Sequence, residues 1–296
     1  MFAAVATAAT SSPRCFGAAS RDPLHRCDNP ELRLMVVPTP SAALLIPGAP
    51  CTPINAVIPV CTFGAASAGA TASVALLGDS HAEHWRAALQ VAAQALDWSA
   101  YDVTHPSCPF TKAILVQGNP QRDACIEWNQ NVLQWFDQNS QISTVITSDH
   151  PGLVMRAPGV SETAARVAGI TSAWAALPAT VKHIIVIRDD PYIDGGTLPC
   201  VTKAIAEDED AGLRCAFPRS VALHVDPDVL AAEKLHSARV QIVDLTHFFC
   251  GSRLCYPVIG GALVYKDDFD HMTSTYSTTL GPYLLRSIRK LMTSWH

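Results

Sequence analysis

Residues 73–85 read SVALLGDSHAEHW, and this stretch sets the expected fold. The segment 73–78 is a nearly continuous apolar run, which is typical of a strand buried on both faces of a parallel sheet. Apolar residues then recur at helical spacing over 81–96. Ser80 therefore lies where a strand passes sharply into a helix, beside an acid and close to a glycine. Such a serine is either an ordinary turn residue or a nucleophile held at the end of a strand.

The same alternation of strand and helix continues along the chain. Further strands are expected at 99–104, 142–148, 182–189 and 238–246, and further helices at 124–139, 161–177, 220–237 and 271–295. Right-handed crossovers between these strands imply a parallel sheet of about five strands with helices on both faces. We therefore expect an α/β fold, a three-layer, flavodoxin-like sandwich. Ligand sites in such sheets gather at the carboxyl ends of the strands, which is where Ser80 lies.

The N-terminal quarter of the chain has a different character. Residues 1–70 are rich in Pro, Ala, Ser and Cys and show little periodicity. The run PTPSAALLIPGAPCTP is incompatible with a regular helix, because proline removes backbone donors and clashes with the preceding turn. We expect residues 1–70 to form an irregular arm or linker, stapled by disulfides and laid on a main domain at 71–296.

The ten cysteines indicate an oxidising compartment. Their number is even, they fall into five pairs of neighbours, and no C-x-x-C motif occurs among them. Ten unrelated buried thiols are the alternative. Proximity predicts five disulfides, which are Cys15–Cys27, Cys51–Cys61, Cys108–Cys125, Cys200–Cys215 and Cys250–Cys255. The net charge of −5 and the lack of a basic patch argue against a nucleic-acid partner.

An oxidised chain needs a route out of the cytoplasm. The start MFAAVATAATSSP lacks a basic segment and is a poor signal peptide, and no later segment is apolar enough to span a bilayer. Either the cysteines are reduced, or the chain is a piece of a longer membrane-anchored protein. We favour the second interpretation.

A serine nucleophile needs a base within hydrogen-bond reach and an acid that orients the base. His81 and His84 are close in sequence but start the helix and point away from or past the turn. Their spacing of three residues also suits metal ligands, but no third ligand group is evident in the sequence, so we expect no metal. Arg188, Asp189 and Asp190 end the fourth strand near the expected site, where they either contact substrate or form an ion pair.

Two Asp-x-x-His units near the C-terminus are better candidates. Asp244 and His247 follow the fifth strand directly and run into a segment that a disulfide is expected to close. Asp268 and His271 lie on a loop that returns to the strand ends, with a helix behind it. We prefer the second unit as the source of acid and base.

These motifs together carry a resemblance. LLGDSHAEHW and VYKDDFDHMTSTYSTTLGPYL resemble the blocks of the SGNH (GDSL-like) hydrolase superfamily. RCFGAASRDPLHRC and VCTFGA are similar to the arm that precedes the SGNH core in one branch, the C-terminal extracytoplasmic SGNH domain of membrane acyltransferase-3 proteins, which O-acetylate cell-surface carbohydrates. The resemblance implies the SGNH hydrolase fold, with Ser80 as nucleophile, His271 as base and Asp268 as orienting acid. It also implies an upstream membrane acyltransferase-3 domain, of which residues 1–12 are a possible stub.

The oxyanion site departs from the superfamily pattern. SGNH enzymes supply a glycine after the second strand and an asparagine after the third, whereas here the strands lead to THPSCPF and TSDH. The backbone N–H of Ser80 remains a donor, helped by the helix behind it. Ser148 and the backbone around Ser107 are the candidates for the second donor.

The sequence thus predicts acyl transfer through an acyl-serine, with a cell-surface or cell-wall carbohydrate as acceptor and acetyl as the acyl group that the resemblance implies. No cofactor is expected. We expect a domain that is monomeric when isolated, on the periplasmic or outer face of the cytoplasmic membrane, tethered through the upstream domain. The alternatives are a secreted carbohydrate esterase or deacetylase with the same triad, and a non-catalytic glycan-binding module.

Overall fold

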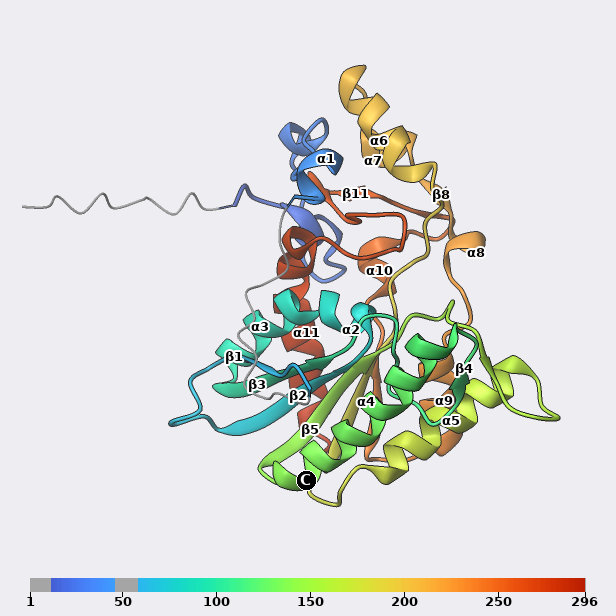
Figure 1. The fold of residues 1–296 in the computed structure, drawn as a ribbon. Coiled ribbons are helices and arrows are strands. Elements are labelled where there is room, and N and C mark those ends of the chain that lie inside the picture. Colours follow the sequence, from blue (N-terminus) through green and yellow to red (C-terminus); the bar gives the residue numbers. More distant parts are fainter. Residues whose placement is uncertain (1–11, 46–57, 296) are drawn as a thin grey trace, which may run out of the picture.

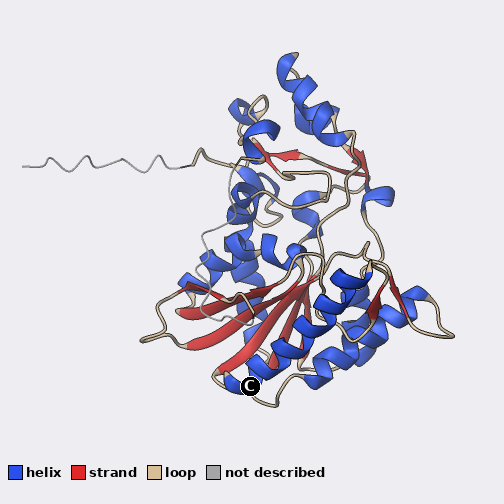
Figure 2. Ribbon diagram, in the orientation of Figure 1, coloured by secondary structure: helices blue, strands red, loops and turns tan. Residues whose placement is uncertain are grey.

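The computed structural model describes residues 12–45 and 58–295, and its centre is a six-stranded sheet (Figures 1 and 2). The strand order is β1-β3-β2-β5-β7-β9. Five strands are parallel, and they are β2 (Ala72–Gly78), β3 (Trp98–Thr104), β5 (Ile142–Ser148), β7 (His183–Ile187) and β9 (Val240–Val243). The prediction of about five parallel strands is confirmed. The sequence did not predict the sixth strand, β1 (Cys61–Gly64), which pairs antiparallel with β3 at the edge.

Helices cover both faces of the sheet, as expected. One face carries α3 (Arg86–Ala95) and α11 (Ser274–Met292), and the other carries α4 (Asn119–Gln138), α5 (Glu162–Ala176) and α9 (Pro227–Leu235) (Figure 1). In chain order the parallel strands lie 2-1-3-4-5, the order of flavodoxin-like sheets. The three-layer sandwich is therefore confirmed.

Alternation along β2 divides the interior into two apolar clusters. Val74 and Leu76 face the cluster of α3 and α11, and Ala75 and Leu77 face the cluster of α4, α5 and α9. All four are fully buried. Both faces of the strand are thus covered, which explains why its sequence is an apolar run without polar alternation.

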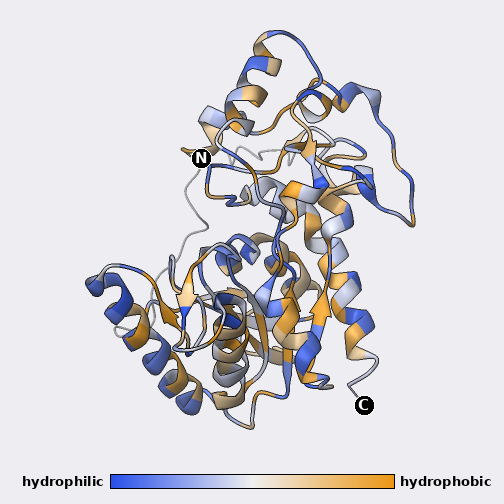
Figure 3. Cartoon of the chain, turned by 90° about the vertical axis from the view of Figure 1, so that its right-hand side faces the viewer, coloured by the Kyte–Doolittle hydropathy of each residue, from blue (hydrophilic) through white to orange (hydrophobic). Residues whose placement is uncertain are grey.

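Shorter elements complete the chain. Around the sheet lie α2 (Ser80–His84), β4 (Ile114–Leu115) and β6 (Met155–Arg156). Beyond the carboxyl ends of the strands lie η1 (Gly17–Arg21), η2 (Pro30–Leu32), α1 (Pro40–Ala43), α6 (Thr197–Ala206), α7 (Ala211–Arg214), β8 (Phe217–Pro218), α8 (Arg219–Ala222), α10 (Thr246–Phe249), β10 (Leu254–Cys255), β11 (Val258–Ile259) and β12 (Ala262–Leu263) (Figure 1). In Figure 3 these elements form a separate group above the sheet.

Two details of this region differ from the sequence analysis. Helix α6 was not predicted, although its residues carry Cys200. The segment 220–237 is not one helix, because it divides into α8 and α9 ahead of Pro227, where the proline is tolerated only in the first turn.

Four of the five predicted disulfides are present: Cys15–Cys27, Cys108–Cys125, Cys200–Cys215 and Cys250–Cys255. The fifth, Cys51–Cys61, involves Cys51, which lies outside the described residues. No helix in the described ranges combines the length and apolarity that a membrane span requires.

The N-terminal arm is laid on the C-terminal part of the chain. Gly17 N–H donates to the carbonyl of Gly260 at 2.9 Å, and Ala18 N–H donates to the hydroxyl of Thr279 on α11 at 3.0 Å. The predicted boundary near residue 70 stays a prediction. Strand β1 lies on its N-terminal side and yet belongs to the central sheet.

One ion pair fastens this arm to α11. The carboxylate of Asp22 is 8% exposed and accepts hydrogen bonds from Arg286 at 2.9 and 3.3 Å. The hydrogen bond from Arg286 holds the pKa of Asp22 well below its ordinary value, against the opposing effect of burial. The charged carboxylate therefore contributes to folding stability.

We predict that Asp22→Asn lowers the free energy of unfolding by about 1–2 kcal/mol at pH 7. Because the pKa is depressed in the folded state, this contribution is present above the unfolded pKa of about 3.9 and is lost as pH falls below it. Urea unfolding of both proteins at pH 7 and pH 3 measures the gap, which should shrink at pH 3. The exposed Asp137→Asn on α4 is the control, and a gap of equal size at both pH values contradicts the assignment.

Candidate active site

Ser80 is held at the turn between β2 and α2. Strand β2 ends at Gly78, Asp79 caps the helix, and Ser80 is its first residue. Gly78 has φ +144°, and a Cβ there would lie 2.6 Å from Asp149 Oδ1 and 2.8 Å from the carbonyl oxygen of Ser148. Only glycine fits this position, so the turn that presents the serine depends on it.

Buried carboxyl groups lock the turn to the neighbouring strand. The side chain of Asp79 accepts hydrogen bonds from the backbone N–H of His81 at 2.8 Å and of His150 at 3.0 Å. The backbone N–H of Asp79 in turn donates to Asp149 Oδ1 at 2.9 Å. Burial raises the pKa of both carboxyl groups. This exchange across the ends of β2 and β5 fixes the backbone on either side of Ser80.

The imidazole that reaches Ser80 is that of His271. Its Nε2 lies 2.9 Å from the Ser80 hydroxyl oxygen, and its Nδ1 lies 2.9 and 3.0 Å from the two carboxylate oxygens of Asp267. Because an ionised carboxylate only accepts, Nδ1 carries the proton and Nε2 is free to accept from Ser80. Burial acts to raise the pKa of Asp267, but the hydrogen bond and charge of His271 outweigh it and lower that pKa. The acid therefore stays ionised beside the imidazole.

The prediction that Asp268 orients the base is wrong. Asp268 is exposed, and the carboxylate on His271 belongs to the preceding residue, Asp267. Asp267 also accepts from the backbone N–H groups of Phe269 and His271, at 3.1 and 3.4 Å, so its side chain closes the loop on itself. This tight loop, with Asp270 at φ +63°, brings the carboxylate four residues before the histidine onto its ring.

The other Asp-x-x-His unit lies away from Ser80. Asp244 accepts from Arg188 Nε at 2.9 Å, and the carbonyl of His247 accepts from Arg21 of the N-terminal arm at 3.0 Å. The unit therefore supports the packing of the arm and the end of β9. The preference for the unit of Asp268 and His271 therefore agrees with the geometry for His271 but not for Asp268.

Ser80 opens into a cleft of about 350 Å³. The cleft is lined by residues that include Ser80, Glu83, Ser107, Lys266, His271 and Ser274. Ser107 has φ +57° in the turn after β3 and thus adopts a backbone conformation that favours glycine. Ser148 does not belong to the described lining, since it lies buried at the end of β5 beside Gly78. Of the two predicted oxyanion positions, Ser107 therefore lines the cleft, whereas Ser148 does not belong to the described lining.

Comparison with known proteins places this site in a family. The profile of the SGNH domain that is fused to AT3 domains matches residues 49–286, most of the chain. The chain belongs to this SGNH family. Its function is accordingly of the acyl-transfer or hydrolase type, and the resemblance inferred from the sequence motifs is confirmed.

A solved structure shares the SGNH fold of the chain. It is the periplasmic domain of a lipopolysaccharide acetyltransferase from Salmonella ser. Paratyphi A, with a TM-score of 0.57 at 14% identity over 73% of this chain and 83% of that one. At this identity the likeness shows the fold alone. The comparison with curated proteins finds no match.

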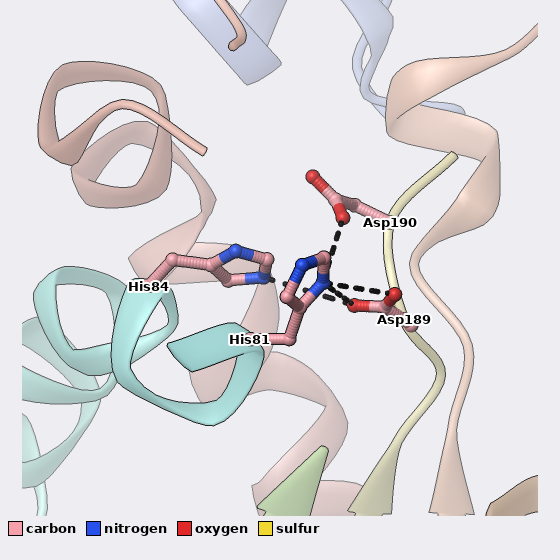
Figure 4. A group of neighbouring side chains, drawn as sticks. All are labelled: His81, His84, Asp189 and Asp190. Atoms are coloured by element: carbon pink, nitrogen blue, oxygen red, sulfur yellow. Dashed lines mark hydrogen bonds and ion pairs between the residues drawn. The ribbon is translucent and has the colours of Figure 1, made fainter. Parts of the chain in front are cut away.

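Behind the SGNH serine lies a group that the sequence analysis did not assemble. His81 and His84 of α2 meet Asp189 and Asp190, which follow β7 (Figure 4). Burial acts to lower the pKa of His81, but the charge and hydrogen bond of Asp189 raise it to about 10. Burial lowers the pKa of His84 and raises that of Asp190. Sequence spacing reveals no third ligand group for the two histidines, because Asp189 is 108 residues beyond His81 and strand order alone brings them together.

The crowding at Gly78 yields a test of the turn. We predict that Gly78→Ala lowers the free energy of unfolding by about 3 kcal/mol or more, because a positive φ and a blocked Cβ act together. Gly69→Ala is the matched control, since Gly69 also has a positive φ, of +97°, but nothing lies within 4 Å of a Cβ there. It should cost only about 1–2 kcal/mol. Urea unfolding measures both, and equal losses contradict the role assigned to the close contacts.

Proposed function

We propose that this SGNH domain catalyses serine-dependent O-acyl transfer to a carbohydrate hydroxyl. The observation that carries the proposal is the line from Ser80 through His271 to Asp267, in which each step is a hydrogen bond of about 2.9 Å. A hydroxyl, an imidazole of defined tautomer and an ionised carboxylate in that order are the parts of a nucleophilic triad. Ser80 is the nucleophile, His271 the general base, and Asp267 the group that orients the base.

The reaction proceeds in two displacements. His271 Nε2 takes the Ser80 proton while Ser80 Oγ attacks the carbonyl carbon of an acyl ester or thioester. The tetrahedral intermediate collapses to an acyl-serine, and His271 returns the proton to the departing alcohol or thiol. A sugar hydroxyl then gives its proton to His271 and attacks the acyl-serine. The second tetrahedral intermediate then collapses. The bond from the acyl carbon to Ser80 Oγ breaks, His271 returns the proton to Ser80, and the acylated sugar is released.

The oxyanion of each intermediate needs two donors. We assign them to the backbone N–H groups of Ser80 and Ser107. Both residues line the cleft, and within the described residues neither N–H donates a hydrogen bond. Ser107 takes precedence over Ser148, whose side chain is buried beneath the turn. The Ser107 position after β3 lacks the glycine of the superfamily but adopts a φ that glycine favours.

The family, a similar solved structure and the disulfides support the assignment of acyl donor, acceptor and location. SGNH domains of this family are fused to AT3 domains, so an upstream membrane acyltransferase-3 domain is the natural acyl donor. The structurally similar domain belongs to a lipopolysaccharide acetyltransferase, which favours acetyl as the acyl group and a carbohydrate as the acceptor. Four disulfides suit an extracytoplasmic location, with the domain tethered to the membrane through its fusion partner.

The triad assignment is tested by hydrolysis of p-nitrophenyl acetate. We predict that Ser80→Ala and His271→Ala each lower kcat/KM by about 10³-fold or more, and that Asp267→Asn lowers it by about 10²- to 10⁴-fold. Asp268→Asn is the matched control, because it removes a neighbouring exposed carboxylate, and its rate should stay close to wild type. If Asp268→Asn is as impaired as Asp267→Asn, the acid is misassigned. Wild-type hydrolysis no faster than Ser80→Ala identifies a binding module.

Acceptor competition separates a transferase from an esterase. With an acetyl ester as donor, we expect oligosaccharides with free hydroxyl groups to raise the rate of donor consumption and to appear as acetylated products by mass spectrometry. Ser80→Ala should give neither effect. Release of acetate at the same rate with and without acceptors, and with no acetylated sugar, supports the secreted esterase instead.

A further inference from the structure

Four metal-binding side chains converge between α2 and β7, behind the catalytic serine (Figure 4). One ligand atom from each of His81, His84, Asp189 and Asp190 lies within 4.8 Å of the other three. His81 Nδ1 is 2.9 Å from Asp189 Oδ1 and 3.8 Å from Asp190 Oδ1, and His84 Nε2 is 3.9 Å from Asp189 Oδ1. The four side chains are only 0–4% exposed, so no bulk water surrounds them.

Three polar atoms in this cluster have ion-pair neighbours at 3.8–3.9 Å or none, and no hydrogen-bond partner among the described residues. His84 Nε2 and both carboxylate oxygens of Asp190 are buried and make no hydrogen bond within the described part of the chain. An unsatisfied buried polar group destabilises the folded state, and more so when it is charged. In Figure 4 a ring nitrogen of His84 faces Asp189 and a carboxylate oxygen of Asp190 faces His81, so a ligand placed among the four side chains would interact with these atoms.

We propose that His81, His84, Asp189 and Asp190 bind one divalent first-row transition-metal ion of the zinc class. Imidazole nitrogen and carboxylate oxygen are ligands of such ions, and four of them make a closed structural site. A tetrahedral site with bonds of about 2.0–2.2 Å has edges of about 3.3–3.6 Å. Three of the six edges are 2.9, 3.8 and 3.9 Å and the others are within 4.8 Å, so the longer edges shorten when the side chains close on the ion. Two carboxylates also balance the charge of a divalent ion, which removes the penalty of placing like charges side by side.

The second shell of the cluster suits a metal at His81 and has to change at His84. His81 Nε2 lies 3.1 Å from the carbonyl oxygen of Phe269, so a His81 ring that binds a metal through Nδ1 keeps Nε2–H as a donor to that carbonyl. His84 Nδ1 accepts from the backbone N–H of Met272 at the long distance of 3.3 Å. A metal on Nε2 moves the proton of His84 to Nδ1. Binding at His84 thus exchanges one long hydrogen bond for a metal–nitrogen bond.

The metal site acts on the active site through position. Phe269 is in the middle of the loop between Asp267 and His271, which carries both the orienting acid and the base. The rings of His81 and His271 are 5.3 Å apart between centroids. A metal ion that fixes His81 therefore fixes the carbonyl of Phe269 and with it the loop. The ion takes no part in a chemical step, and the proposal does not rest on the identity of the acyl acceptor.

Zinc and cobalt binding test the proposal directly. The untagged, oxidised chain is stripped with a chelator, desalted and titrated with Zn²⁺ by calorimetry, and its bound metal is then measured by mass spectrometry. We expect one Zn²⁺ per chain, visible d–d bands of tetrahedral geometry with Co²⁺, and a higher unfolding midpoint with the metal. Asp190→Asn and His84→Ala should each weaken binding at least about 10- to 100-fold.

Matched variants distinguish this site from surface binding. His25→Gln removes an exposed histidine that lies beside Asp22, and Asp268→Asn removes an exposed carboxylate; both should bind Zn²⁺ as the wild type does. Ser80→Ala should also bind it unchanged, so failure of the proposed acyl transfer leaves this test intact. The near-ultraviolet circular dichroism of Asp190→Asn reports whether that isosteric variant is folded. A folded Asp190→Asn that binds Zn²⁺ as tightly as wild type, or a wild type that binds none, overturns the proposal and leaves His81 as a positioning residue alone.

Discussion

The hydrogen bond from the backbone of Asp79 to the carboxyl group of Asp149 is the constraint on which the site depends. It ties the end of β2 to the end of β5 at the point where the chain turns into α2. The side chain of Asp79, which caps α2, adds a second link by accepting a hydrogen bond from the backbone N–H of His150. Gly78 makes room for it, because any side chain there meets Asp149 and Ser148. This arrangement, and not the contacts of Ser80 itself, holds Ser80 at the carboxyl end of the central strand β2.

The base arrives from the far end of the chain, and long-range contacts hold it there. The loop that carries Asp267 and His271 precedes α11. Helix α11 packs on α3, which follows the serine turn and α2 in the chain. Ser277 of α11 donates to the carbonyl of His84 at 2.7 Å and accepts from Ala88 at 3.1 Å. The proposed nucleophile and base are thus 191 residues apart in sequence, but they lie beside helices that are hydrogen-bonded to each other.

The region beyond the sheet serves the same site. Its N-terminal arm is fastened to α11 by Asp22 and Arg286, and α11 in turn backs the catalytic loop. Four disulfides close loops outside the strands of the sheet, and Cys108–Cys125 and Cys250–Cys255 lie within the two apolar clusters. A rigid support of this kind suits a triad whose hydrogen bonds must keep their length through two displacements.

The sequence by itself determined the elements that depend on local pattern. The apolar run before Gly78, the helical periodicity after it and the four further strand–helix units specified the parallel sandwich, and the block around Ser80 specified the family and the proposed nucleophile. Proximity along the chain specified the four disulfides of the described residues. Each of these signals lies within a few residues, so periodicity and spacing are enough to read them.

Only the tertiary structure decided which carboxylates act. Three aspartates precede His271, and the choice of Asp267 over Asp268 depends on how the loop closes, through hydrogen bonds that no spacing rule encodes. Edge strand β1 lacks a long apolar run and becomes a strand by pairing with β3. The meeting of His81 and His84 with Asp189 and Asp190 depends on the strand order, because β5 lies between β2 and β7 in the sheet. Contacts between residues more than a hundred positions apart are set by packing, and packing is a property of the folded whole.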